Sequence, residues 1–230
     1  MSQREFDKKL LSLPHRRALQ KNMLKDNSNI KDEVIEHGKC FICGYMLNAT
    51  CKSDNWIELM LGFAQRKETG AVGAKLIYPD ATIQTAGLIL DEKGNVRRSH
   101  YRYPSNSLGY AGRILSIQNV SAVAAACMMV KRDVFNEVGG FDPQFVVAHG
   151  DIDFCLKLRE KNYLIVYEPH VELYHYESLT RGYEDTPEKA ERLNRETRLL
   201  LKKRGHILEK GDPYFNPNLT ADREDFSIRA

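Results

Sequence analysis

The stretch NEVGGFDPQFVVAHGDIDFCLKLREKNYLIVYEP, residues 136–169, decides the fold more than any other part of the chain. It predicts, in order, the end of a helix, a loop, an amphipathic helix and a buried strand. Gly139 and Gly140 should end the first helix, because glycine accepts the left-handed backbone of a helix C-terminus. The amphipathic helix spans residues 151–161, and LIVYEP at 164–169 has the apolar run of a strand buried on both faces.

Two carboxylates stand at the start of the amphipathic helix, Asp151 and Asp153. The first turn of a helix presents unpaired N–H groups and the positive end of the helix dipole, which keep a carboxylate ionised and oriented. Such a group is suited to act as a general base or to face a metal ion. The alternative is that Asp151 is only an N-cap and Asp153 only a favourable first-turn acid.

Helical and strand patterns alternate along the rest of the chain. We expect helices at 56–65, 131–138 and 186–207, and strands at 71–79, 83–90, 121–130 and 171–176. Pro169 should separate the last strand from the strand at 164–169. The pattern predicts an α/β class of the mixed α+β type, with helices flanking a partial Rossmann-like sheet and a long helix near the C-terminus. That helix has one predicted packing stripe, made of Ala190, Leu193, Thr197, Leu200 and Leu201.

The composition indicates a globular protein whose partners cannot be inferred from charge. Of the 230 residues 42% are hydrophobic, which is enough for a sizeable core. The 34 basic and 31 acidic residues give a net charge of +3, so we expect no nucleic-acid partner. No apolar run approaches the ~20 residues that span a bilayer, and the N-terminus lacks the apolar segment of a signal peptide, so a cytoplasmic location is expected. The basic segment 1–35 leaves peripheral contact with an anionic membrane surface as an alternative.

The cysteines favour packed, reduced thiols over disulfides, because they are five in number and mostly lie in apolar runs. One segment offers an alternative, since HGKCFICGYMLNATC at 37–51 holds four residues able to bind zinc: His37, Cys40, Cys43 and Cys51. The apolar residues between these ligands favour a buried strand, and the spacing fits no common zinc finger closely. We therefore expect no zinc.

Together these motifs resemble the acceptor-side, C-terminal half of the family-2 glycosyltransferases, which have the GT-A fold. The resemblance covers about three quarters of the chain, and its specificity comes from the order and spacing of short pieces. These pieces are Trp56, Gly73-Ala74-Lys75-Leu76, Thr82-Ile83-Gln84-x-Ala86-Gly87, Gly139-Gly140-Phe141-Asp142, Asp151-x-Asp153-x-Cys155, Tyr167-x-Pro169, Leu173-Tyr174-His175-x-Glu177-Ser178 and Asp212-Pro213-Tyr214-Phe215-Asn216-Pro217-Asn218-Leu219.

The resemblance implies a reaction in which a sugar passes from a nucleotide-sugar to an acceptor hydroxyl with inversion. It assigns the role of the general base to Asp151, although His149-Gly150 precede it where the family has an acidic or amide residue. The acceptor loop is implied to contain Gly139, Gly140, Phe141, Asp142 and Asp153. On the donor side the resemblance implies diphosphate contacts from His175, Ser178 and Arg181, with His175 also near the metal. For His175 and Arg181 the alternatives are a half-buried strand histidine and a solvated surface arginine.

The donor side is where the chain departs from the family. The family holds Mg²⁺ or Mn²⁺ through an acidic motif at a strand end, and Asn48-Ala49-Thr50 stand where Asn-Asp-Thr is usual, so alanine replaces a metal carboxylate. Residues 1–47 have one good strand pattern, so we expect the nucleotide-binding half to be truncated or replaced. We expect a divalent cation if the protein is active.

The sequence predicts three parts: an atypical N-terminal segment at 1–52, a glycosyltransferase-like acceptor-side domain at 53–210, and a C-terminal tail at 211–230. By family analogy the activity would serve bacterial surface polysaccharide synthesis, in the cytoplasm or at the inner membrane face. Its partners would be a nucleotide-sugar and a saccharide or lipid-linked acceptor, with a homodimer or a partner chain completing the sheet. The alternative is a non-catalytic carbohydrate-binding or interaction module.

Overall fold

Two long parallel strands, β2 (Thr69–Ile77) and β8 (Leu164–His175), form the centre of the fold. The computed structural model describes residues 49–52, 55–91, 95–176, 186–220 and 226–228, and for residues 49–51 it describes the backbone alone. Strand β1 (Ala49–Cys51) pairs antiparallel with β8, and β3 (Ile83–Thr85) pairs antiparallel with β2, giving the order β1-β8-β2-β3. Two short strands complete this sheet: β6 (Gln118–Asn119) pairs with β8 and β7 (Met128–Met129) with β2.

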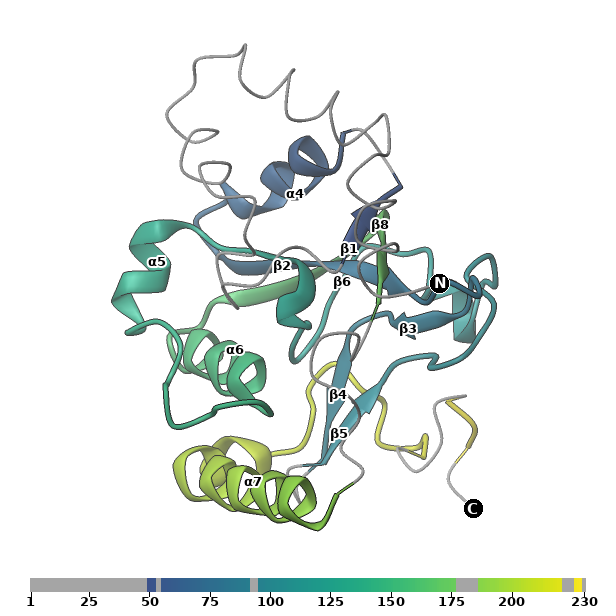
Figure 1. Ribbon diagram of the computed structural model, residues 1–230. Coiled ribbons are helices and arrows are strands. Elements are labelled where there is room, and N and C mark those ends of the chain that lie inside the picture. Colours follow the sequence, from purple (N-terminus) through teal and green to yellow (C-terminus); the bar gives the residue numbers. More distant parts are fainter. Residues whose placement is uncertain (1–48, 53–54, 92–94, 177–185, 221–225, 229–230) are drawn as a thin grey trace, which may run out of the picture. The chain divides into compact units, whose positions relative to one another are not determined.

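Helices cover both faces of this sheet (Figure 1). On one face α4 (Trp56–Ala64) packs Met60 and Ala64 against Val72 of β2 and Val166 of β8. The opposite face is covered by α6 (Gly150–Glu160), and α7 (Pro187–Leu208) packs against α6. This core includes Ala71, Ile114, Phe154, Leu156, Leu158, Ile165, Tyr167, Leu200 and Leu208. Because both faces are covered, β2 is buried along its whole length, as its apolar run predicts.

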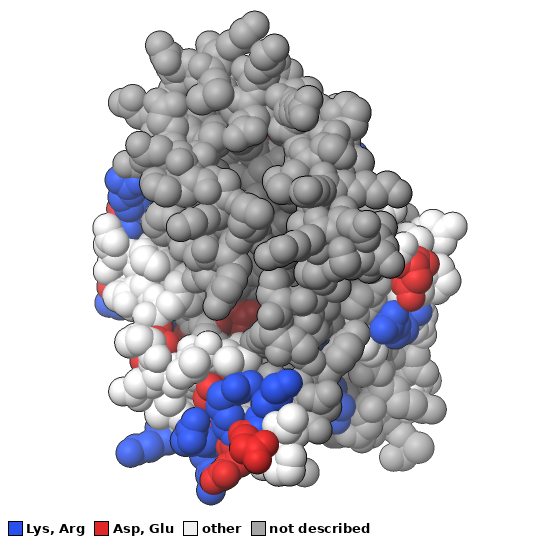
Figure 2. Space-filling model, in the orientation of Figure 1, with Lys and Arg blue, Asp and Glu red and all other residues white. Residues whose placement is uncertain are grey.

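The predicted helices and the fold class are confirmed. The observed bounds of α4, α6 and α7 lie within one or two residues of the predicted ones, and α5 (Arg132–Glu137) fills the predicted helix at 131–138. The structure is of the mixed α/β type, and its 22-residue helix α7 is the long C-terminal helix that the sequence predicts. Figure 2 shows basic and acidic side chains intermixed at the end of the molecule where α7 lies. No helix of the described residues is long and apolar enough to cross a membrane.

Three strand predictions need correction. Residues 121–130 form a 3₁₀ turn, η2 (Ala125–Cys127), followed by the two-residue strand β7. The predicted strand at 83–90 divides into β3 and β4 (Leu88–Leu90), because Gly87 has a φ of +91° and turns the chain. Strand β8 is continuous through Pro169, because the register jumps from Ala74–Glu168 to Lys75–Glu172 and leaves the proline in a bulge outside the ladder.

The hairpin of β4 and β5 (Val96–Arg98) forms a second sheet, and the C-terminal segment packs beside it. Ile89 of β4 forms a small core with Leu219, Phe226 and the half-buried Phe215. Asp212 accepts the backbone N–H of Leu90 at 3.0 Å. The closing motif at 212–219 therefore holds this hairpin, while the three-part division at 52/53 and 210/211 stays a prediction.

Candidate active site at the start of helix α6

Asp151 lies in the first turn of α6, half-buried and held by two backbone groups. Its Oδ1 accepts the N–H of Ile152 at 2.9 Å, and its Oδ2 accepts the N–H of Ala125 in η2 at 3.2 Å. The residue before the helix, His149, has a left-handed backbone with φ of 62°, which turns the chain sharply into α6. The carboxylate is thus oriented from both of its oxygens.

Burial raises the pKa of the Asp151 carboxyl above its usual value, and this effect outweighs the opposing N–H groups and His149. A carboxylate with a raised pKa is a stronger base than an exposed aspartate, and it binds a transferred proton more tightly. The site can therefore take a proton from an alcohol placed against it. This is the chemistry that the sequence predicts for Asp151.

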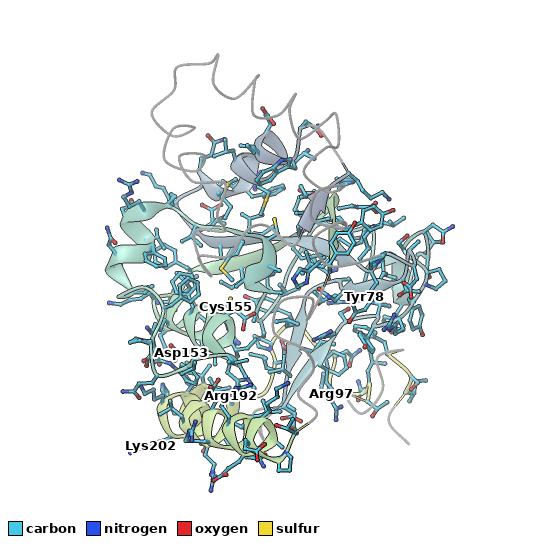
Figure 3. All side chains as sticks on the ribbon, viewed as in Figure 1. Tyr78, Arg97, Asp153, Cys155, Arg192 and Lys202 are labelled. Carbon is cyan, nitrogen blue, oxygen red and sulfur yellow. The ribbon has the colours of Figure 1, made fainter. Side chains whose placement is uncertain are left out.

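The two other acids of the predicted acceptor loop are paired with consecutive basic residues of α7. Asp142 forms an ion pair with Lys203, which is the main reason that the pKa of its carboxyl lies below the usual value. Asp153 is fully buried, and its Oδ1 accepts Arg204 Nε at 2.8 Å. Figure 3 shows Asp153 on α6, on the side toward α7. In this arrangement both acids fasten the loop and the helix to α7.

The Gly139–Phe141 segment shapes the beginning of the same loop. Gly139 and Gly140 have φ values of 76° and 61°, and a Cβ on Gly140 would lie 2.8 Å from the Phe135 ring. Phe141 packs against Phe154 of α6 with ring centroids 4.6 Å apart and the rings tilted by 30°. The glycines therefore end α5, as predicted, and Phe141 anchors the loop to α6. Their contact with an acceptor stays a prediction.

His175, the donor-side candidate, is the last residue of β8. Its Nδ1 lies 2.7 Å from Oε1 of the buried Gln84 on β3. An amide oxygen only accepts, so Nδ1 carries the proton in this contact, and Nε2 is the nitrogen that the neutral form of the ring would offer to a metal. The β1–β8 register places Ala49 directly opposite His175. The pairing of β1 with β8 thus brings together two positions of the predicted metal site: His175, a predicted ligand, and Ala49, where alanine replaces the expected carboxylate.

The donor set for a metal is incomplete in the part of the chain that the structure describes. No group of three His, Cys, Asp or Glu side chains able to hold a metal occurs there. His175 supplies one nitrogen, and alanine at position 49 offers no donor atom. These residues alone do not fit a Mg²⁺ or Mn²⁺ site. Ser178, Arg181 and the possible zinc ligands His37, Cys40 and Cys43 lie outside the described residues, as does the side chain of Cys51.

The sequence patterns did not predict that residues from two other elements, Ala125 of η2 and Glu196 of α7, help to hold Asp151 and the turn before it. Ala125 lies in a segment expected to be a strand, and nothing in its surroundings marks its N–H as a partner of a carboxylate. Glu196 points inward from α7 and is 2% exposed, although the apolar stripe favoured Ala190 and Leu193, which are exposed. The signal in the sequence was the four-residue spacing of Glu196 from Leu200, which is buried, so that both lie on the same side of the helix.

Comparison with known sequences finds relatives, two of which match about three quarters of this chain. The uncharacterized protein y4gI of Sinorhizobium fredii is 46% identical over 175 residues, which are 76% of this chain and 19% of that protein. The O-antigen biosynthesis protein RfbC of Myxococcus xanthus is 32% identical over 176 residues, 76% of this chain and 13% of RfbC. A Mycobacterium tuberculosis N-acetylglucosaminyl-diphospho-decaprenol L-rhamnosyltransferase is 32% identical over 63 residues, 27% of this chain and 20% of the enzyme.

The chain thus spans about a fifth or less of the length of these relatives. No protein-family model matches it. A crystal structure of GalNAc-T7 with UDP, GalNAc and Mn²⁺ superposes with a TM-score of 0.43 and 14% identity over 60% of this chain and 28% of that one, which is too distant to inform the site. The names of two sequence relatives, an O-antigen biosynthesis protein and a rhamnosyltransferase, agree with the glycosyltransferase resemblance seen in the motifs.

Proposed function

We propose that this chain provides the acceptor side of an inverting, family-2 glycosyltransferase of polysaccharide synthesis, with Asp151 as the general base. The observation that carries the proposal is the geometry of Asp151: a half-buried carboxylate at a helix N-terminus, oriented by the N–H groups of Ala125 and Ile152. The names of two relatives, an O-antigen biosynthesis protein and a rhamnosyltransferase, support the polysaccharide context.

In the proposed reaction the acceptor is a saccharide or lipid-linked hydroxyl and the donor a nucleotide-sugar. Asp151 takes the hydroxyl proton as the oxygen attacks the anomeric carbon, and the bond from that carbon to the nucleoside diphosphate breaks on the opposite face. A divalent cation would neutralise the leaving diphosphate. Since the described residues do not complete its site, the cation and the nucleotide require protein groups beyond them.

The experiment is a transfer assay with a panel of nucleotide-sugars and saccharide or polyprenyl-linked acceptors, comparing the wild-type protein with Asp151→Asn. We expect the variant to lose at least ~100-fold in rate, the lower end of what a positioned base contributes. Asp133→Asn is the matched control, because Asp133 is an exposed acid in the first turn of α5. Equal rates for Asp151→Asn and the wild type would refute the base.

A second candidate function is a non-catalytic carbohydrate-binding module, and alanine opposite His175 favours it. Calorimetric titration of the chain with nucleoside diphosphates and with oligosaccharides, each with and without Mn²⁺, distinguishes the transferase from the binding module. Metal-dependent binding of micromolar strength, about −8 kcal/mol, supports a donor site. Metal-independent binding of oligosaccharide, with no binding of any nucleotide, supports the module.

A further inference from the structure

Two neighbouring residues of α7, Glu196 and Thr197, hold the turn that leads into the base Asp151. Glu196 Oε2 accepts the N–H of Ala148 at 2.6 Å and that of Val147 at 3.3 Å. Thr197 Oγ1 lies 2.9 Å from His149 Nε2. Three consecutive residues before α6 are therefore fastened to two consecutive residues of α7, about 48 positions away in sequence.

The contact with Thr197 determines which nitrogen of the His149 ring carries the proton. The Thr197 hydroxyl donates to the carbonyl of Leu193 at 2.9 Å, so its oxygen is left to accept from His149 Nε2–H. Burial lowers the pKa of His149, and the nearby carboxylates of Asp151 and Glu196 oppose that effect. The ring is therefore neutral at pH 7, with its proton on the nitrogen that faces α7.

The backbone at His149 needs such support. A non-glycine residue with a φ of 62° carries a conformational cost of about 1 kcal/mol or more, which persists only where surrounding contacts enforce it. The turn at 147–149 sets the point at which α6 begins, and the His149 carbonyl accepts the N–H of Asp153 at 2.8 Å. A change in this turn would therefore move the first turn of α6, and Asp151 with it.

We propose that Glu196 is a positioning residue for Asp151, acting through the N–H groups of Val147 and Ala148, with Thr197 fixing His149 in the same turn. This inference rests on the proposed function, because it assumes that Asp151 is the base. It assigns to α7 a role beyond packing: the helix sets the direction and the hydration of the catalytic carboxylate. Asp142–Lys203 and Asp153–Arg204 fasten the flanks of the same segment.

Glu196 allows two variants that separate positioning from stability. In Glu196→Gln the amide oxygen can still accept the two N–H groups, whereas Glu196→Ala removes the oxygen that accepts them. The other carboxylate oxygen, Oε1, is buried without a hydrogen-bond partner among the described residues, so the Gln amide nitrogen would have no acceptor there either. We expect both variants to lower the melting temperature but only Glu196→Ala to release the turn.

The readout is the titration of Asp151, followed by NMR on the full chain with ¹³C-labelled aspartate carboxyls and assigned from the signal missing in Asp151→Asn. Among the described residues, His149 and Cys155 interact electrostatically with this carboxylate. Burial raises the pKa of the Cys155 thiol to about 12, so of these two groups His149 is the one that titrates in the same range. We expect Glu196→Ala to return the Asp151 pKa toward its ordinary value, because the opened turn admits water, and Glu196→Gln to keep it near that of the wild type.

An Asp151 titration in folded Glu196→Ala that matches the wild type would overturn the proposal. If Glu196→Ala does not fold, Thr197→Val is decisive: the near-isosteric change removes the acceptor of His149 Nε2–H and should lower the His149 pKa further, because the charged ring loses a hydrogen-bond acceptor. If the His149 titration is unchanged in Thr197→Val, the proposal that α7 fixes the turn before Asp151 is rejected. The transfer assay is independent of these results, so a shifted Asp151 titration together with an active Asp151→Asn would retain the contact to α7 and reject only the base.

Discussion

Arg204 on α7 donates its Nε to Oδ1 of Asp153 on α6 at 2.8 Å, although 51 residues separate them in sequence. Asp153 is fully buried, and Arg204 also donates its Nη1 to Oε2 of Glu160 at 2.7 Å. A buried carboxylate that loses its partner remains desolvated, which is why breaking such a pair costs far more than forming a surface pair gains. The pair thus fixes α7 against α6.

Arg204→Ala should therefore lower the free energy of unfolding by about 3 kcal/mol. Lys157, at 3.5 Å from Asp153, would compensate only in part. The measurement is urea denaturation, with Arg195→Ala as control because Arg195 is exposed on the same helix. A loss in Arg204→Ala no larger than that in Arg195→Ala would show that the pair does not hold the two helices together.

We expect a Gly→Ala substitution to have opposite effects on stability at two positions, 73 and 62. A Cβ on Gly73 of β2 would lie 2.3 Å from Val123 Cβ, a clash that forces backbone movement, so Gly73→Ala should cost about 2 kcal/mol. Gly62 on the exposed side of α4 has nothing within 4 Å, so Gly62→Ala should stabilise by about 0.5–1 kcal/mol through helix propensity.

Thermal melts of both variants check this pair of predictions. Measured against Val123→Gly alone, the double variant Gly73→Ala/Val123→Gly should recover part of the loss from the first substitution, because it removes the Val123 Cβ at 2.3 Å and both Cγ atoms. No recovery would mean that the loss at position 73 comes from backbone effects instead of the contact with Val123.

His100 predicts a loss of stability in mild acid. It is fully buried, its ring stacks on Phe226 at 4.5 Å, and burial lowers its pKa from 6.5 to about 4. The unfolded chain therefore binds a proton between pH 6.5 and about 4 that the folded chain does not. Stability from this group is present above pH 6.5 and is lost as the pH falls through that window, on the order of 2 kcal/mol in total.

His100→Gln should flatten this dependence, since glutamine does not titrate, while lowering stability at neutral pH through the lost stacking. Urea denaturation of both proteins at a series of pH values from 7 to 4 measures the two slopes. A variant that loses stability with acid as steeply as the wild type would assign the effect to other groups.

Ala49→Asp should create metal affinity beside His175. Directly opposed residues of antiparallel strands have Cβ atoms about 4.5–5.5 Å apart, so a carboxylate at position 49 and the His175 ring can bind one ion. We expect Mn²⁺ binding to rise at least about 10-fold, measured by calorimetry or by electron paramagnetic resonance. Ala49→Asn is the control of matched shape, and binding that survives in Ala49→Asp/His175→Ala would place the ion elsewhere.

Local rules predicted the helices of this protein and the presence of a base candidate. Gly139 and Gly140 end α5, and Thr186 with Pro187 begins α7, because caps depend on the nearest few residues. The prediction failed at Pro169, where a bulge opposite β2 kept β8 continuous. A bulge depends on the partner strand, which sequence periodicity does not contain.

The sequence by itself determined the order of the elements, the glycosyltransferase resemblance and the candidacy of Asp151, since all of these rest on short-range spacing. Only the tertiary structure decided how Asp151 is held: by Ala125 from η2 and, through the turn at 147–149, by Glu196 and Thr197 from α7. It also placed Ala49 opposite His175. The physical reason is that hydrogen bonds and strand register join residues that are distant in sequence, and the residue types alone do not specify which of the many possible pairs the packed chain will form.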